Sequence, residues 1–502
     1  MSRQVSRLVV ITLLILPAFA FAESPAPARP NILWLISEDT GPDLACYGEP
    51  AVKTPNLDAL AARGMRFTRA FTVTGVCSTS RSSFMTGMYA VTIDAQNHRS
   101  HRGKPDTDNP LPDGVRLLTH WLKDAGYFTA NLRHFTTEQD PKWMHGTGKT
   151  DWNFSYPGKD FDTKNDITQL PKNQPFYAQI NFSETHRGGD WNAADKRVAE
   201  PVDPAKVRIP PYYPNHPVVR ADWAQYLDAV QALDMQVGVV LRRLDELKLA
   251  DNTIIIYIGD HGRAMPRGKQ WPYDSGLHIP FILYIPDKLQ VQGYTPGKVS
   301  DRIIESIDLT ATTLALAGVE KPVKMQGKVF LGPNAEAPRQ YAFGFRDRGD
   351  ETVDRIRSVR DARFRYLRNF YPERPFLQLN RYKESSYPII TVMRYLHEQG
   401  KLTGPPLALM APTRPAEELY DIVNDPYEIN NLARDPEYIE DLSRLRGVLN
   451  QWIEDVDDQG RYPEPPEVTD HWEQVMHRNY DKSGRRAAAR AKVIEQIKAT
   501  EK

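Results

Sequence analysis

Two short apolar runs, residues 31–36 and 253–258, each end in acidic side chains. The residues that follow these runs are Glu38 and Asp39 in the first case, and Asp260 and His261 in the second. Continuous apolar runs of this length are typical of strands buried on both faces of a parallel sheet. Because ligands gather at the carboxyl ends of such strands, the pattern predicts an α/β fold with a polar site along one edge of its sheet.

Strand-like and helix-like segments alternate along the rest of this region. Residues 55–64 have helical apolar spacing, with Asn56 as a possible N-cap and a terminal glycine, and strand-like residues 65–68 follow. Further predicted elements are helices at 117–125 and 223–247 and a strand at 176–182. The alternation predicts a doubly wound α/β fold, with a mixed or parallel sheet and helices on both of its faces.

The residue pattern of the sequence changes after about residue 335. Arginine-rich, strand-like residues such as 363–367 and a predicted helix at 436–456 indicate a smaller C-terminal α+β subdomain. We therefore predict a catalytic domain at 23–335 and a subdomain at 336–463.

Two segments fit neither pattern. Between residues 135 and 173 the apolar periodicity is lost, which predicts a long surface excursion near the site. The charged residues 464–502, with their Ala-Arg repeats, are expected to form a peripheral helix or a frayed tail.

Residues 1–22 have the features of a secretory signal peptide. Arg3 and Arg7 precede an apolar run at 8–19, and small residues mark a cleavage site near Ala22. The run is shorter than the ~20 residues that a membrane-spanning helix needs, so no stable membrane insertion is expected. The sequence therefore predicts a secreted or periplasmic protein.

The overall charge is balanced, with 64 basic and 64 acidic residues. Nothing in the net charge favours a nucleic acid or a membrane surface as partner, so any anion must be bound by local groups. With 40% hydrophobic residues and no long biased tract, the composition is that of a globular protein with a large core.

The four polar residues after the two strands are candidate metal ligands. Two strand ends of one parallel sheet can bring Glu38, Asp39 and Asp260 around a single ion, with His261 beside them. Three carboxylates favour a hard divalent cation. Helix capping or a solvated turn is the alternative for the first pair.

The segment Cys77-Ser78-Thr79-Ser80-Arg81 resembles the activation motif of type I sulfatases. The resemblance implies that a formylglycine-generating maturase oxidises the Cys77 thiol to an aldehyde. The hydrate of this aldehyde then attacks the sulfur of a sulfate ester or sulfamate, while Arg81 holds it. Thr79 stands where the family usually has Pro or Ala.

The resemblance also covers the residues around the predicted metal. It implies an alkaline-phosphatase-like sheet and a cation held by Glu38, Asp39, Cys77, Asp260 and His261. Calcium is the first choice because similar family members use it, magnesium the second and zinc the last. Since a disulfide would consume the proposed nucleophile, we predict that Cys46 and Cys77, the two cysteines of the chain, are unpaired.

Two further residues match family positions that act on the sulfate. Lys269 lies in a segment like the one whose lysine or arginine grips the sulfate, and a solvated loop lysine is its alternative. His186 follows the strand predicted at 176–182 and matches the histidine that assists the leaving group.

The family's Gly-Lys-x-His motif has two competing placements. Gly148-Lys149-Thr150-Asp151 keeps the lysine, whereas Asn131-Leu132-Arg133-His134 keeps the histidine. We prefer Lys149, because a buried anion needs positive charge more than a particular base. Asp151 then acts as a base or orients Lys149.

Basic residues beyond the motif are candidates for sugar recognition. His98 and Arg99 follow the nucleophile segment and are predicted to bind substrate, with a basic surface loop as the alternative. Arg346, Arg348 and Asp350 are offered for the same role. Within the family, the likeness is greatest to the N-sulfoglucosamine sulfohydrolase group and its bacterial relatives, from about residue 29 to 460.

These features together predict an exported hydrolase that removes sulfate from a glycosaminoglycan-like saccharide. A phosphodiesterase or phosphonate hydrolase of the same superfamily is one alternative, because related folds handle tetrahedral phosphorus with similar ligands. A glycan-binding pseudo-sulfatase is the other, because of Thr79 and the broken Gly-Lys-x-His motif. Whether the scissile bond joins sulfur to nitrogen or to oxygen is left open.

Overall fold

A computed structural model describes residues 29–101, 108–133, 147–164 and 167–501 of the chain. Its centre is a seven-stranded sheet with the strand order β3-β4-β1-β5-β6-β2-β7. Strand β6 is antiparallel to both of its neighbours, and the other pairs are parallel. The seven strands are β1 (Asn31–Ser37), β2 (Met65–Phe71), β3 (Phe128–Arg133), β4 (Phe176–Phe182), β5 (Thr253–Gly259), β6 (Phe281–Tyr284) and β7 (Val299–Glu305).

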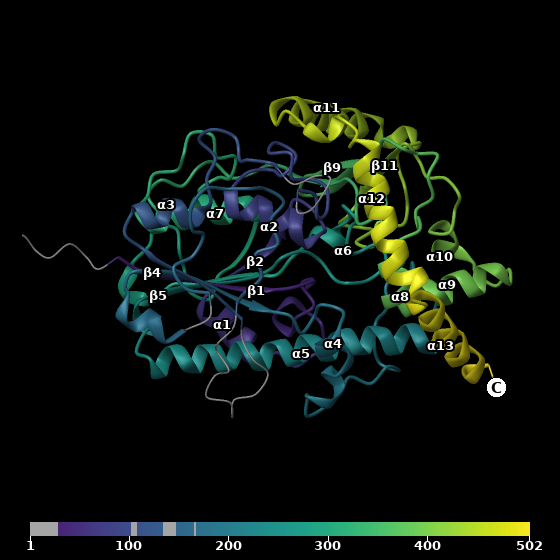
Figure 1. The fold of residues 1–502 in the computed structure, drawn as a ribbon, viewed down its shortest axis with the longest axis horizontal. Helices are drawn as coiled ribbons and strands as arrows, with labels where there is room; N and C mark the ends of the chain where they lie inside the picture. Colours follow the sequence, from purple (N-terminus) through teal and green to yellow (C-terminus); the bar gives the residue numbers. More distant parts are fainter. Residues whose placement is uncertain (1–28, 102–107, 134–146, 165–166, 502) are drawn as a thin grey trace, which may run out of the picture.

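Helices cover both faces of this sheet (Figure 1). One face packs against α1 (Pro55–Arg63) and the long α5 (Pro217–Glu246), and the other against α2 (Cys77–Thr86), α3 (Leu118–Asp124) and α7 (Ser306–Leu316). The predicted doubly wound α/β fold is therefore confirmed. Helix α5 begins six residues earlier than predicted, because the His216 side chain accepts a hydrogen bond from the Val218 N–H and Pro217 occupies the first turn.

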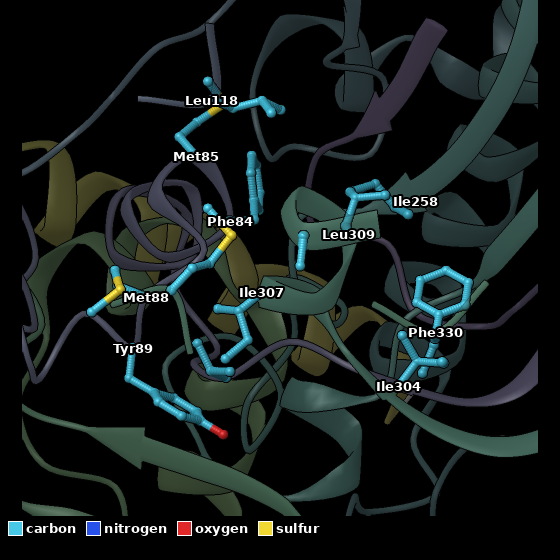
Figure 2. Packing of buried hydrophobic residues seen from close by; sticks show 14 of the residues in the cluster. Phe84, Met85, Met88, Tyr89, Leu118, Ile258, Ile304, Ile307, Leu309 and Phe330 are labelled. Atoms are coloured by element: carbon cyan, nitrogen blue, oxygen red, sulfur yellow. The ribbon is translucent and has the colours of Figure 1, made fainter. Parts of the chain in front are cut away.

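A second, four-stranded antiparallel sheet has the order β11-β10-β9-β8. Its strands are β8 (Ala342–Arg346), β9 (Ile356–Arg360), β10 (Phe364–Asn369) and β11 (Glu417–Asp421), and α11 (Ile439–Asp455) packs on β9 and β10. Buried side chains of this sheet join the cluster that packs between α2 and α7, part of which is drawn in Figure 2. The smaller α+β unit thus shares its core with the main sheet, and the boundary at residue 335 stays a prediction.

The last part of the chain is helical and packed. Helix α12 (Pro466–Met476), a π-helical turn (His477–Lys482) and α13 (Arg485–Thr500) follow one another (Figure 1). Helix α13 buries Val493 and Ile497 and lies against α8 (Arg381–Ser386) and α9 (Pro388–Glu398). Of the two alternatives for this region, the structure shows the peripheral helix. The remaining short helices are α4 (Gly189–Asn192), α6 (Asp274–Leu277) and α10 (Gly404–Ala408).

The excursion predicted at 135–173 does pass near the site, since Lys149 contacts Glu38, but its described part is not confined to the surface. Trp152, Phe154 and Phe161 are buried in the same core as the main sheet. The rings of Trp152 and Phe154 stack with centroids 5.9 Å apart. Aromatic side chains contribute so much apolar area that they enter a core even from a segment without helix or strand periodicity.

The signal peptide predicted at 1–22 lies outside the described residues. Among the residues that are described, no helix combines the length and the apolar character needed to cross a bilayer.

Candidate active site

The site lies at the carboxyl ends of β1 and β5. These strands are parallel neighbours, with Ser37 opposite Gly259, so the residues that follow them emerge side by side. The Asp39 N–H donates a hydrogen bond of 2.9 Å to Asp260 Oδ1. The structure therefore confirms the prediction that the acidic residues after β1 and β5 lie next to each other.

Asp39, Asp260 and His261 form a buried group whose ligand atoms all lie within 4.8 Å of one another. The Nδ1 atom of His261 donates a hydrogen bond to the Gly262 carbonyl oxygen, 2.8 Å away. Nε2 is therefore the ring nitrogen that could bind a cation. Nε2 is buried and, among the described residues, makes no hydrogen bond, although Asp39 Oδ1 is 2.9 Å away. Two carboxylates and an unsatisfied imidazole nitrogen fit a divalent cation.

Positive side chains surround these carboxylates. Lys269 Nζ donates to both Asp39 oxygens at 2.9 and 2.8 Å. Burial would raise the pKa of Asp39, but Lys269 and His261 hold it well below its usual range. Burial also disfavours a charged imidazole, yet in the absence of a cation the carboxylates of Asp260 and Asp39 raise the pKa of His261 to about 10. A cation that binds Nε2 must therefore displace a proton from this nitrogen. The pocket therefore keeps its two aspartates ionised and ready to bind a cation.

Cys77 is the first residue of α2 and is 4% exposed. Its thiol contacts the His261 side chain, which places it beside the candidate metal ligands. The Ser80 hydroxyl, one turn further along α2, donates to the Asp260 carbonyl oxygen at 2.5 Å and ties the helix to the end of β5. Cys46 and Cys77 are both free, as predicted.

Arg81 is buried and bridges two strands. Its Nε donates to Asp260 Oδ2 at 3.1 Å, and its NH1 donates to Asn181 Oδ1 at 2.7 Å. Asn181 also donates to Asn131 on the neighbouring strand at 2.8 Å. Sequence reasoning did not assign a role to Asn181. Its signal was that β4 carries two buried amides, Gln179 and Asn181, among apolar residues, and buried amides need polar partners.

A cavity of about 280 Å³ opens beside these residues. Lys149 lines it and donates to Glu38 Oε2 at 2.7 Å. Gly148 lets the chain pass here, because a Cβ at that position would lie 2.1 Å from Asn131 Oδ1. The residues lining the cavity are Glu38, Arg133, Thr147, Lys149, Asn181, Ser183 and His186.

This cavity brings together both placements of the Gly-Lys-x-His motif. Lys149, from the first placement, and Arg133, from the second, both line it. Asp151 Oδ2 lies 3.8 Å from Lys149 Nζ. His134 lies outside the described residues.

Burial, followed by the charge of Lys269, lowers the pKa of His186. The preference for Lys149, the metal role of Glu38 and the acid role of His186 all stay predictions.

Comparison with known proteins now decides the family. Residues 30–319 match the model of the sulfatase family, and residues 259–386 match that of the C-terminal part of N-sulphoglucosamine sulphohydrolase. The chain belongs to the sulfatase family.

Relatives of this sulfatase span most of its length. It is 34% identical over 488 residues to an ulvan-active sulfatase of Formosa agariphila, covering 90% of this chain and 79% of the relative. It is 28% identical over 482 residues to human N-sulphoglucosamine sulphohydrolase, covering 85% and 90%. A phosphonate monoester hydrolase from Silicibacter pomeroyi superposes with a TM-score of 0.60 at 19% identity, covering 86% of this chain and 96% of that one, and shares the fold.

The sulfatase places His98 and Arg99 next to α2, the helix that begins with Cys77. His98 Nδ1 lies 2.8 Å from the Ser78 hydroxyl, and its Nε2 lies 3.6 Å from Asp350 Oδ1. The Arg99 guanidinium also lies 3.6 Å from Asp350 Oδ1, and 47% of its side chain is exposed. Asp350 thus orients both residues, and their role in substrate binding stays a prediction.

The prediction that Arg346 and Arg348 bind the sugar is wrong. Arg348 is buried and donates to Glu464 at 2.6 and 2.9 Å. Arg346 is buried beside Asp354 at 3.4 Å, with its guanidinium over the Trp271 ring. Arg346 and Arg348 are 5% and 2% exposed, so neither guanidinium is open to a sugar that approaches from solvent.

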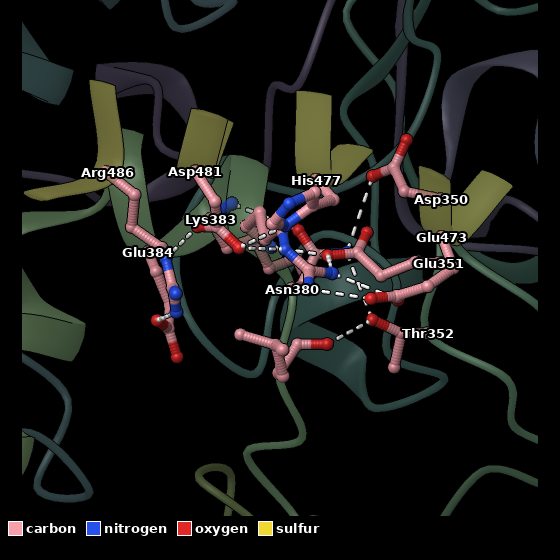
Figure 3. Close-up of polar contacts among 12 residues, drawn as sticks. Asp350, Glu351, Thr352, Asn380, Lys383, Glu384, Glu473, His477, Asp481 and Arg486 are labelled. Atoms are coloured by element: carbon pink, nitrogen blue, oxygen red, sulfur yellow. Dashed lines mark hydrogen bonds and ion pairs between the residues drawn. The ribbon is translucent and has the colours of Figure 1, made fainter. Parts of the chain in front are cut away.

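The C-terminal helices hold the start of α8 against the site (Figure 3). The Arg381 guanidinium donates to Asp481 at 2.6 Å and to Glu473 at 3.0 and 2.7 Å. The residues on either side face the site: Asn380 donates to Asp350 at 3.4 Å, and Lys383 Nζ donates to the Lys269 carbonyl oxygen at 2.7 Å. Arg381 is therefore a positioning residue that acts through α8.

Replacing Arg381 by Gln is expected to lower kcat/KM about 10-fold, since supports behind a site typically matter this much. It removes a guanidinium shared by carboxylates of α12 and the π-helical turn, so the start of α8 loosens. The control Arg490→Gln breaks an exposed pair of α13 with Glu398 and is expected to change little. Equal kinetics for both variants and the wild type would show that α8 needs no such anchor.

Proposed function

We propose that this protein is an exported sulfatase that removes a sulfate ester or N-sulfate from a glycosaminoglycan-like saccharide. The observation that carries the proposal is the buried group of Asp39, Asp260 and His261 beside Cys77, in a chain of the sulfatase family. The names of two relatives, an ulvan-active sulfatase and N-sulphoglucosamine sulphohydrolase, support a sulfated saccharide as substrate.

We expect the site to contain two further groups, a divalent cation and a formylglycine at residue 77. Asp39, Asp260 and His261 would hold a cation together with Glu38 and residue 77, and the carboxylates suit a hard divalent cation. Ca²⁺ is placed ahead of Mg²⁺ because similar sulfatases use it. A maturase would convert Cys77 to formylglycine. When bound, these groups supply a nucleophilic hydroxyl and neutralise negative charge on the sulfate.

The protein's own cations orient the sulfate group. Lys269 pairs with Asp39 and Lys149 pairs with Glu38, and both lysines are proposed to neutralise sulfate oxygens. Arg81, held by Asp260 and Asn181, fixes the start of α2 and with it residue 77. These contacts hold the reacting group in one orientation before substrate arrives.

His186 is the proposed proton donor to the leaving oxygen or nitrogen. It lines the cavity with Lys149, so a substrate that enters this cavity reaches both side chains. An anionic sulfate group nearby favours the protonated imidazole and offsets the lowering by burial. The proton is thereby available when the bond to sulfur breaks.

Export follows from the signal peptide predicted at residues 1–22, and it would deliver the protein to the periplasm or the medium. Sulfated polysaccharides are too large and too charged to cross a membrane unaided, so an enzyme outside the cytoplasm meets them directly. The expected mature protein begins near Glu23.

The proposal is tested by comparing sulfate, phosphate and phosphonate esters of 4-nitrophenol. We expect the sulfate ester to have the highest kcat/KM, because the cations of the site match a singly charged sulfate ester. A higher value for the phosphonate ester would favour the phosphonate hydrolase whose fold this chain shares. Turnover of none of the three, with retained glycan binding, would favour the pseudo-sulfatase.

A further inference from the structure

A second cavity, of about 330 Å³, lies where the loop at 94–101 meets the C-terminal segment. Gln96 and Asn97 line it, and the next two residues of the loop are His98 and Arg99, beside α2. The Thr79 hydroxyl of α2 donates to the Gln96 carbonyl oxygen at 3.4 Å. One short loop therefore separates this cavity from the active site.

Gln96 carries an unsatisfied acceptor in this cavity. Its side chain is 2% exposed, and its Nε2 donates to Asp94 Oδ1 at 2.9 Å. This contact fixes the amide, because the opposite orientation would set two oxygens against each other. Oε1 is then left buried without a hydrogen-bond partner among the described residues. A buried amide oxygen of this kind calls for a donor, such as a hydroxyl group.

Tyr462 forms an aromatic wall of the same cavity. It is 60% exposed, and the Arg461 guanidinium lies over its ring at 4.9 Å. Pro463 and Pro465 follow it, and Glu464 between them is held by Arg348. Proline and this ion pair keep the segment rigid, so stacking on Tyr462 costs little ordering entropy.

The charge of the cavity selects against an anionic ring. Among its described lining residues there is no lysine or arginine, whereas Asp94, Glu464 and Glu467 are present, with His101 near Asp94. Arg461, which lies over the Tyr462 ring, is paired with Asp457. Glu464 is neutralised by Arg348, and the other two carboxylates would repel a sulfate or uronate group. An aromatic wall, an acceptor amide and carboxylates suit a ring rich in uncharged hydroxyls.

We propose that this cavity is a second saccharide subsite, which binds an uncharged sugar ring of an oligosaccharide whose sulfated ring occupies the active site. The inference rests on the proposed function. It implies that the protein distinguishes polymeric from small substrates through Tyr462 and Gln96, on the far side of the loop that carries Arg99.

The test compares Tyr462→Ala, Tyr462→Phe and wild type on 4-nitrophenyl sulfate and on size-defined ulvan and heparan sulfate tetrasaccharides whose uronate carboxyl groups have been reduced to uncharged alcohols. We expect Tyr462→Ala to raise KM for the tetrasaccharides about 3- to 10-fold with kcat unchanged, as for loss of one aromatic contact. Tyr462→Phe keeps the ring and is expected to behave as wild type. Tyr427→Ala, which removes another exposed tyrosine, is the matched control.

Two results would overturn the subsite: unchanged KM of Tyr462→Ala for every tetrasaccharide, or an equal rise for the tetrasaccharides and 4-nitrophenyl sulfate. Calorimetric titration with chemically desulfated tetrasaccharides provides a readout besides turnover. Weaker binding by Tyr462→Ala than by Tyr427→Ala supports the subsite, and equal binding contradicts it. If wild type hydrolyses no sulfate ester but the titration separates the variants, the proposed activity fails while the subsite stands.

Discussion

Cys77→Ala is expected to lose sulfate-ester hydrolysis by a factor on the order of 10⁵ or more, since removing a nucleophile has effects of this size in other hydrolases. The side chain at 77 lies beside His261 at the start of α2, next to the candidate metal ligands. The measurement is kcat/KM on 4-nitrophenyl sulfate, with circular dichroism to verify the fold.

Cys46→Ala is the matched control, because Cys46 is also a free cysteine. It is expected to keep full activity. Mass spectrometry of the peptide containing residue 77 should show the aldehyde in the wild type. An active Cys77→Ala variant, or an active wild type with only the plain thiol, would remove Cys77 from the chemistry. A plain thiol together with inactivity would instead favour the glycan-binding alternative.

Removal of the divalent cation is expected to lower kcat at least about 100- to 1000-fold, since a bound metal is worth several kcal/mol of charge stabilisation. Without it, the carboxylates of Asp39 and Asp260 face the sulfate and are offset by side chains such as Lys269, Arg81 and His261 alone. Chelation followed by dialysis, metal analysis and assay measures the effect. Ca²⁺ is expected to restore more activity than Mg²⁺.

Asp39→Asn separates metal binding from other effects of the chelator. Because a ligand that binds only the folded state stabilises it, Ca²⁺ should raise the Tm of the metal-free wild type but not that of Asp39→Asn. Asp287→Asn, on the short helical turn after β6, is the control and should respond as wild type. Full activity in protein shown to be free of metal would refute a role for the cation.

The local patterns of the sequence were sufficient for the fold and for the neighbourhood of the metal. Runs such as 253–258 predicted buried strands, and β5 contains this run from Thr253 onward. The acidic residues after β1 and β5 then had to meet if the strands were neighbours in a parallel sheet. Strand ends, helix caps and the motif around Cys77 each depend on a few adjacent residues, so they can be recognised in the sequence alone.

Other features depend on residues that are far apart in the chain. Arg348 was expected at the sugar, but Glu464, more than a hundred residues later, buries it. Asn181, the cavity at Gln96 and the anchoring of α8 by Arg381 likewise involve partners from distant segments.

The sequence alone therefore determined the α/β class, several of its strands and helices and the candidate residues for the chemistry. Only the tertiary structure decided which of the many arginines and carboxylates pair with each other and which stay open to a ligand. The reason is physical: periodicity and caps arise from interactions between near neighbours, whereas burial and charge pairing depend on packing between segments that the chain brings together only on folding.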